Sequence, residues 1–94
     1  MPIFQVYLSK RAQKQLERVP SFIAEKLLGW VQSVSEIGLQ EVRKIPGYHD
    51  EPLHGDRTGQ RSIRLNRSYR AIYEVKEENQ VEFVLIEEVI HHDY

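Results

Sequence analysis

Three strand-like segments follow one another at 59–65, 69–76 and 81–89, with only short turns between them. Each segment is rich in β-branched and aromatic residues, and the turns carry Asn, Ser and Glu side chains. Connections this short can join only antiparallel neighbours, because a parallel pair needs a crossover of a dozen or more residues. The C-terminal half of the chain therefore predicts an antiparallel sheet, in which the apolar run 84–86 marks a central strand.

The N-terminal segment predicts a strand followed directly by a helix. Residues 3–8 alternate in a pattern of β-branched and aromatic side chains, which indicates a strand. Ser9 then has the position of an N-cap, and Ala12 and Leu16 follow at helical spacing. We expect a short amphipathic helix over residues 9–18.

A second, longer helix is predicted after Pro20, with Ser21 as its cap and Gly38 at its end. The tight break at Pro20 predicts a helical hairpin in which both helices contribute to one core. The segment 43–59 holds two prolines and three glycines, so it is expected to be a loop.

These elements predict an α+β fold with an N-terminal strand, a two-helix hairpin, and antiparallel strands that form a sheet with the helices on one face. The other face of the sheet stays open, so polar side chains there are available for chemistry. With 94 residues and 40% hydrophobic content, the chain can bury one core but not two. We expect a single domain over residues 1–94.

Composition excludes several classes of function. The chain has no cysteine, which removes disulfide, thiol-nucleophile and zinc-thiolate chemistry. The start, MPIFQVYLSK, lacks a signal-peptide core, and no segment is apolar over the length that spans a bilayer. We therefore expect a cytoplasmic protein that does not associate with membranes.

Five arginines crowd into residues 57–70 without one acidic residue among them, although the formal net charge is only −1. In the simplest hairpin register Arg64 and Arg70 face each other on the open side of the sheet, where like charges repel. An anion would relieve this repulsion, and forked guanidinium groups match phosphate oxygens. The alternative is structural pairing with carboxylates on the neighbouring strand. Those carboxylates are Glu82, Glu87 and Glu88.

Further cations extend the basic surface. Arg57, Arg61 and Arg67 occupy loop, strand-start and turn positions, where they would support nucleic-acid binding by charge. A second group of cations lies at helical spacing in the first helix, so its members are expected to form one stripe. The stripe is either a solvated helix face or a grip on RNA phosphates. Its members are Lys10, Arg11, Lys14 and Arg18.

Histidines are the candidate proton carriers, because their charge changes near neutral pH. His54 lies in the loop before the arginine-rich strands, and His91 and His92 precede the terminal Asp93 and Tyr94. No HExxH or other paired spacing is present, so metal binding is a poor explanation for these residues. We expect neither a metal nor a cofactor.

The string PLHGDRTGQRSIRLNRSYRAIYEV and the closing HDY resemble the RelE/ParE superfamily of bacterial toxins, and most closely its HigB-type members, which cleave mRNA. The resemblance implies a toxin–antitoxin module, cleavage of mRNA on the translating ribosome, and inhibition by a cognate antitoxin with a DNA-binding domain. His54 stands where relatives often have a catalytic lysine, and Arg70 matches an arginine used on the scissile phosphate. The final histidine of many relatives is missing.

Without metal or cysteine, such a nuclease would use the RNA's own 2′-hydroxyl as nucleophile and leave a 2′,3′-cyclic phosphate. Arg64 and Arg70 would stabilise the developing charge. His54 and His92 are candidates for base and acid, without assignment between them. Asp93 would orient a histidine or act as the base, and Tyr94 would stack on a base or donate a proton.

Two other functions remain open. ParE-like relatives of the same fold inhibit DNA gyrase, and a chain that had lost its catalytic groups would only bind an antitoxin. The histidines and the terminal Asp93 and Tyr94 favour the nuclease, because a gyrase inhibitor has no need of proton carriers.

Overall fold

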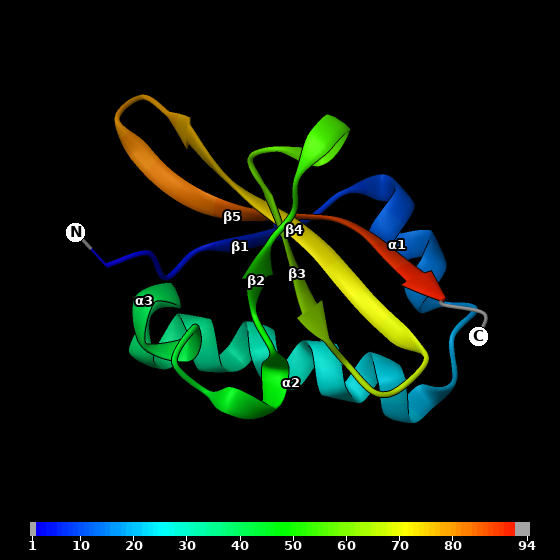
Figure 1. Ribbon diagram of the computed structural model, residues 1–94. Coiled ribbons are helices and arrows are strands. Elements are labelled where there is room, and N and C mark those ends of the chain that lie inside the picture. Colours follow the sequence, from blue (N-terminus) through cyan, green and yellow to red (C-terminus); the bar gives the residue numbers. More distant parts are fainter. Residues whose placement is uncertain (1, 92–94) are drawn as a thin grey trace.

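A computed structural model describes residues 2–91 (Figure 1). The elements in chain order are β1 (Val6–Leu8), α1 (Lys10–Leu16), α2 (Ser21–Ile37), α3 (Leu39–Val42), the 3-10 turn η1 (Pro46–Tyr48), β2 (Glu51–Pro52), the 3-10 turn η2 (Gly55–Arg57), β3 (Gln60–Arg64), β4 (Tyr69–Glu78) and β5 (Val81–His91). The predicted α+β class is confirmed. The predicted loop 43–59 in fact contains the two 3-10 turns and the two-residue strand β2.

The strands form one sheet in the order β1-β5-β4-β3-β2. As predicted, β3, β4 and β5 are antiparallel neighbours. The sheet as a whole is mixed, because β1 runs parallel to β5, with Val6 opposite Val84 and Leu8 opposite Ile86. Short turns determine the direction of the last three strands, but most of the chain, with the helices and the other three strands, lies between β1 and β5, so no turn constrains their relative direction.

Ser9 caps α1, as the sequence predicts. Its Oγ accepts a hydrogen bond of 3.0 Å from the Ala12 amide and donates one of 2.6 Å to the Glu87 carbonyl. Ser9 therefore ties the start of α1 to β5. The second helix differs from the prediction at its start, where Pro20 is the N-cap without a side-chain hydrogen bond and Ser21 is already helical.

Replacing Ser9 by alanine is expected to lower the free energy of unfolding by about 1–2 kcal/mol, because the helix loses its cap and the Glu87 carbonyl loses a donor. Urea unfolding followed by circular dichroism measures the change. Ser35→Ala is the matched control, since the exposed Ser35 hydroxyl only bonds back to the Gln32 carbonyl within α2. Equal losses in both variants would contradict a capping role for Ser9.

The core lies between the helices and one face of the sheet. Helix α2 runs along this face (Figure 1) and buries Ile23, Leu27, Trp30 and Val34 completely. The strands and the start of the β3–β4 turn contribute buried residues at alternate positions, except in β5, where a register shift separates Ile86 from Val89. These are Ile63, Leu65, Ala71, Tyr73, Val84, Ile86 and Val89. In the described part of the chain, no helix is long and apolar enough to cross a membrane.

Candidate functional site

Arg64 on β3 lies directly opposite Arg70 on β4, so the predicted register is confirmed. The intervening residues Leu65 and Tyr69 close the turn by a backbone hydrogen bond of 2.9 Å, and the Asn66 side chain accepts from the Ser68 and Tyr69 amides. This turn places Arg64 and Arg70 opposite each other on neighbouring strands. Such a pair of like charges costs a few tenths to about 1 kcal/mol.

The two arginines differ in how their charges are compensated. Arg70 donates from Nε to the Ser62 hydroxyl at 2.7 Å and from Nη2 to a Glu51 carboxylate oxygen at 3.2 Å. Arg64 has no hydrogen bond or ion pair with any of residues 2–91. The carboxylate that pairs with Arg70 is therefore Glu51 of β2, not one of the β5 glutamates considered from the sequence.

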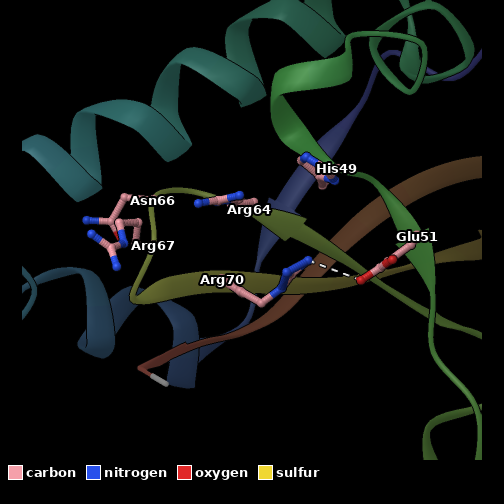
Figure 2. Close-up of a pocket in the computed structure, with 6 residues that line it drawn as sticks. All are labelled: His49, Glu51, Arg64, Asn66, Arg67 and Arg70. Atoms are coloured by element: carbon pink, nitrogen blue, oxygen red, sulfur yellow. Dashed lines mark hydrogen bonds and ion pairs between the residues drawn. The ribbon is translucent and has the colours of Figure 1, made fainter. Parts of the chain in front are cut away.

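Both arginines line one hollow of about 340 Å³, here called the arginine pocket (Figure 2). Figure 2 shows Arg70 pointing toward Glu51 across the pocket, with His49 above them. Two further side chains, both from the β3–β4 turn, complete it. The lining residues are His49, Glu51, Arg64, Asn66, Arg67 and Arg70. Three cations and one carboxylate make the pocket a site for an anion.

A second hollow of about 410 Å³ adjoins the arginine pocket, because Glu51 and Arg70 line both. Its remaining lining is largely apolar and includes Leu53, Ile72 and Ile90. An anionic group in the arginine pocket would thus lie beside a surface that fits a flat apolar group, such as a nucleobase.

A buried polar network lies behind the site. The Asp50 side chain is fully buried and accepts hydrogen bonds of 2.6 Å from the Tyr73 hydroxyl and from Arg61 Nε. Arg43 donates to the Tyr73 oxygen at 3.2 Å. Burial and the hydrogen bond to Asp50 raise the pKa of Tyr73, although Arg43 opposes the shift. Tyr73 therefore stays protonated as a donor to Asp50.

The raised pKa of Tyr73 predicts a loss of stability in alkaline solution. The unfolded chain releases this proton near pH 10.0, whereas the folded chain retains it to higher pH. Above pH 10 the free energy of unfolding should therefore fall, by at most about 1.4 kcal/mol per pH unit for this one group. Denaturant unfolding at pH 9–11.5 should give a steeper fall for the wild type than for Tyr73→Phe. Identical slopes would contradict the prediction.

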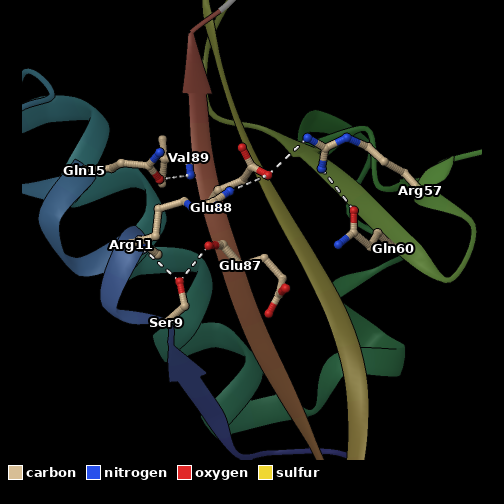
Figure 3. A network of polar contacts seen from close by, with 9 residues as sticks. Ser9, Arg11, Gln15, Arg57, Gln60, Glu87, Glu88 and Val89 are labelled. Carbon is tan, nitrogen blue, oxygen red and sulfur yellow. Dashed lines mark hydrogen bonds and ion pairs between the residues drawn. The ribbon is translucent and has the colours of Figure 1, made fainter.

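The other arginines of the 57–70 cluster are distributed differently. Arg67 lines the arginine pocket, but Arg61 is committed to Asp50 on the helix side of the sheet. Arg57 bonds to Gln60 and to Glu88, whose carboxylate also pairs with Arg11 of α1 (Figure 3). Of the three predicted supporting cations, Arg67 therefore lines the arginine pocket, Arg57 lines the adjoining second hollow, and Arg61 lines neither.

The predicted proton carriers are only partly tested by the geometry. His54 is the exposed N-cap of η2 and does not line either hollow beside Arg70. His91 lies opposite Tyr69, with ring centroids 4.6 Å apart, and Ile90 lies opposite Arg70. Strand β5 thus leads toward the site. The remaining predictions, His92, Asp93 and Tyr94, lie outside the described residues.

The four cations of the predicted stripe lie on one surface, although α1 ends at Leu16 and Arg18 lies in the turn after it. The four members of the stripe and Gln15 line a hollow of about 610 Å³. Arg11 is the member with an ion pair, to Glu88 at 3.4 Å, and its side chain is still two-thirds exposed. The members are Lys10, Arg11, Lys14 and Arg18. Among residues 2–91 no three His, Cys, Asp or Glu side chains gather in a way that could hold a metal.

The family model of the ParE toxin of the type II toxin–antitoxin system parDE matches residues 6–93. The chain belongs to the ParE toxin family. It is thus a toxin of the type II toxin–antitoxin class, within the RelE/ParE group that the sequence resembles. No curated protein sequence matches it significantly.

Solved structures share the fold of this ParE-family chain at low sequence identity. The YoeB/ParE toxin from Agrobacterium tumefaciens has a TM-score of 0.68 at 18% identity, covering 95% of this chain and 99% of that one. The archaeal RelE–RelB complex from Pyrococcus horikoshii gives 0.69 at 21%, covering 97% and 96%. The RelBE2 toxin–antitoxin complex from Mycobacterium tuberculosis gives 0.67 at 22%, covering 98% and 100%.

Sequence reasoning missed three pocket residues of the ParE-family chain. One is Asn66 in the β3–β4 turn, and the other two are His49 and Glu51. Both lie in the segment expected to be a loop, where β2 has only two residues and so leaves no readable alternation. Pro52 was the available signal, because proline within a sheet is confined to edge strands and bulges. An edge strand next to β3 would have placed Glu51 near Ser62.

Proposed function

We propose that this ParE-family toxin is a HigB-type endoribonuclease that cleaves mRNA without a metal, on the translating ribosome. The observation that carries the proposal is the opposition of Arg64 and Arg70 in one pocket, with Arg64 lacking any partner among residues 2–91. A phosphate there would neutralise two like charges that the hairpin register forces together. Arg70 uses two of its five N–H donors within the protein, so three remain for phosphate oxygens.

The proposed reaction moves two protons and exchanges one bond. A base takes the proton of the ribose 2′-hydroxyl, the oxygen attacks phosphorus, the bond to the 5′-oxygen breaks, and an acid protonates that oxygen. Arg64 and Arg70 stabilise the negative charge that develops on the phosphorane. Glu51 and His49 are the proton carriers that line the arginine pocket.

The residues implied by the resemblance stay in this scheme as candidates for the acid, or, for Asp93, as the group that orients a histidine, while the base is reassigned. His54 adjoins Leu53, which lines the second hollow. In the sequence, His92, Asp93 and Tyr94 follow His91, the last residue of β5. We propose Glu51 as the base, since its carboxylate lies 3.2 Å from the Arg70 guanidinium that would hold the phosphate. The acid is then one of the histidines or Tyr94.

The proposed partners follow from charge. The stripe Lys10, Arg11, Lys14 and Arg18 would hold ribosomal RNA by phosphate contacts, and Arg57 and Arg67 would add to the positive potential, whereas Arg61 is paired with Asp50. A cognate antitoxin with a DNA-binding domain would cover the basic surface with an acidic segment. Among the solved structures, RelE and RelBE2 are seen in complexes with antitoxins. We propose the cytoplasm as the location and 1–94 as one toxin domain.

The test is incubation of the purified chain with a defined transcript in a cell-free translation reaction and in buffer alone. We expect cuts only in the translating reaction, with 5′-hydroxyl and 2′,3′-cyclic phosphate ends, and no loss of cleavage when EDTA is added to the chain before mixing. Primer extension locates the cuts, and resistance of the new 3′ end to periodate oxidation identifies the cyclic phosphate. Intact transcripts in both reactions would refute the proposal.

A second candidate is inhibition of DNA gyrase, which the sequence resemblance attaches to ParE-like members and which the match to the ParE family model favours. A supercoiling assay with purified gyrase separates the two functions. Inhibited supercoiling with intact transcripts would establish the second candidate. Absence of both activities would leave a module that only binds its antitoxin.

A further inference from the structure

His49 and Glu51 line the arginine pocket, and the residue between them points the other way. The Asp50 side chain enters the protein interior, where it has no exposed surface. It accepts 2.6 Å hydrogen bonds from Tyr73 and from Arg61 Nε, and Arg61 Nη2 also approaches the Asp50 carbonyl at 3.5 Å. These contacts, here called the Asp50 network, hold the middle residue of the segment 49–51 in place.

The hydrogen bonds of the Asp50 network are costly to break, because a buried carboxylate without donors is strongly destabilising. Removing one partner of a buried ion pair typically costs several kcal/mol, far more than an exposed pair contributes. The donors come from β3 and β4, and Arg43 at the end of α3 holds the Tyr73 hydroxyl in turn. The rigid centre of the sheet thus determines where this segment of the chain lies.

The backbone is strained at His49, the residue before Asp50. His49 has φ of 45°, in the left-handed region that costs a non-glycine residue about 1 kcal/mol or more. Its amide closes the η1 turn on the Pro46 carbonyl at 3.1 Å. Such a conformation persists only where the surroundings impose it. The adjacent Asp50 contacts supply that constraint.

We infer that Asp50 is a positioning residue for the arginine pocket: held by Arg61 and Tyr73, it fixes the strained segment that presents His49 and Glu51 to Arg64 and Arg70. The inference rests on the proposed nuclease function, because it assigns Asp50 a role in the geometry of that same site. In this inference Arg61 holds Asp50 and does not contact RNA.

Asp50→Asn and Tyr73→Phe test the inference. The first removes the charge of the carboxylate and the second removes a hydroxyl donor, and both keep nearly the same side-chain volume. Cleavage in the translating reaction should lose about tenfold in kcat in either variant, with KM within about twofold, because the phosphate-binding arginines remain while Glu51 is displaced. Hydrogen exchange of residues 46–52 should become faster. If Asp50→Asn does not fold, Tyr73→Phe, which lacks only a hydroxyl, carries the test.

Val34→Ala is the matched control, because it weakens the core of α2 without touching the network. It should unfold more easily but cleave with wild-type kcat and leave exchange at 46–52 unchanged. Wild-type kcat and exchange in both network variants would overturn the inference. If the wild type itself does not cleave, the nuclease proposal fails, and exchange at 46–52 alone then decides whether Asp50 positions the segment.

Discussion

Replacing Arg70 by alanine is expected to lower the rate of RNA cleavage by about 10²-fold or more. Arg70 is the pocket residue with the most fixed geometry, since Ser62 and Glu51 orient its guanidinium from two sides. A preoriented donor aimed at developing charge typically contributes this much to kcat. Transcript cleavage at saturating substrate measures the loss.

The fold should survive this substitution. The variant loses the hydrogen bond to Ser62, at about 1 kcal/mol, but it also loses the repulsion between Arg64 and Arg70. Lys76→Ala is the control, because Lys76 lies on the same strand and pairs only with Glu74. Cleavage at the wild-type rate by Arg70→Ala would remove the arginine pocket from the mechanism, whatever the behaviour of Asp50 variants.

Replacing Trp30 by alanine is expected to lower the free energy of unfolding by about 3–5 kcal/mol. Trp30 is fully buried in the middle of α2, and its ring lies 5.1 Å from that of Tyr73 at the centre of the sheet. The indole Nε1 is buried without a hydrogen-bond partner among the described residues. The loss therefore reflects the apolar burial and packing of the indole together with the cavity left behind, with no hydrogen bond to a described residue.

Urea unfolding measures this loss, and Leu28→Ala on the exposed side of α2 is the control. Leu28 is about half exposed, so its truncation should change stability by about 0.5 kcal/mol or less. A Trp30→Ala variant as stable as Leu28→Ala would mean that α2 does not pack on the sheet through this residue. Because Tyr73 also holds Asp50, the cavity should loosen the segment behind the arginine pocket as well.

The pairing of Arg64 with Arg70 was predictable because it depends only on local geometry. A short turn between two strands determines their register, and strand alternation then determines which side chains share a face. The capping role of Ser9 and the end of α2 at Gly38, where φ is 89°, follow from similarly local rules. Each of these predictions needed only neighbouring residues.

Apart from the edge-strand signal of Pro52, the sequence offers no local pattern for Glu51, His49 and Asp50, because their roles depend on contacts with residues distant in the chain. Glu51 meets Arg70 across β3, and Asp50 meets Tyr73 across 23 positions. The two-residue strand that brings them there has no pattern of its own. The role of Arg61 also depends on tertiary structure. Its residue type suggests a nucleic-acid contact, but on the helix side of the sheet it forms an ion pair with Asp50.

By itself, the sequence determined the α+β class, the three antiparallel strands and the opposed arginines, since turns and alternation act over a few residues. Only the tertiary structure decided that β1 runs parallel to β5, that Glu51 is the carboxylate at Arg70, and that Asp50 is buried behind them. The physical reason is that burial and long-range pairing compete among all possible partners, and the packed sheet selects one.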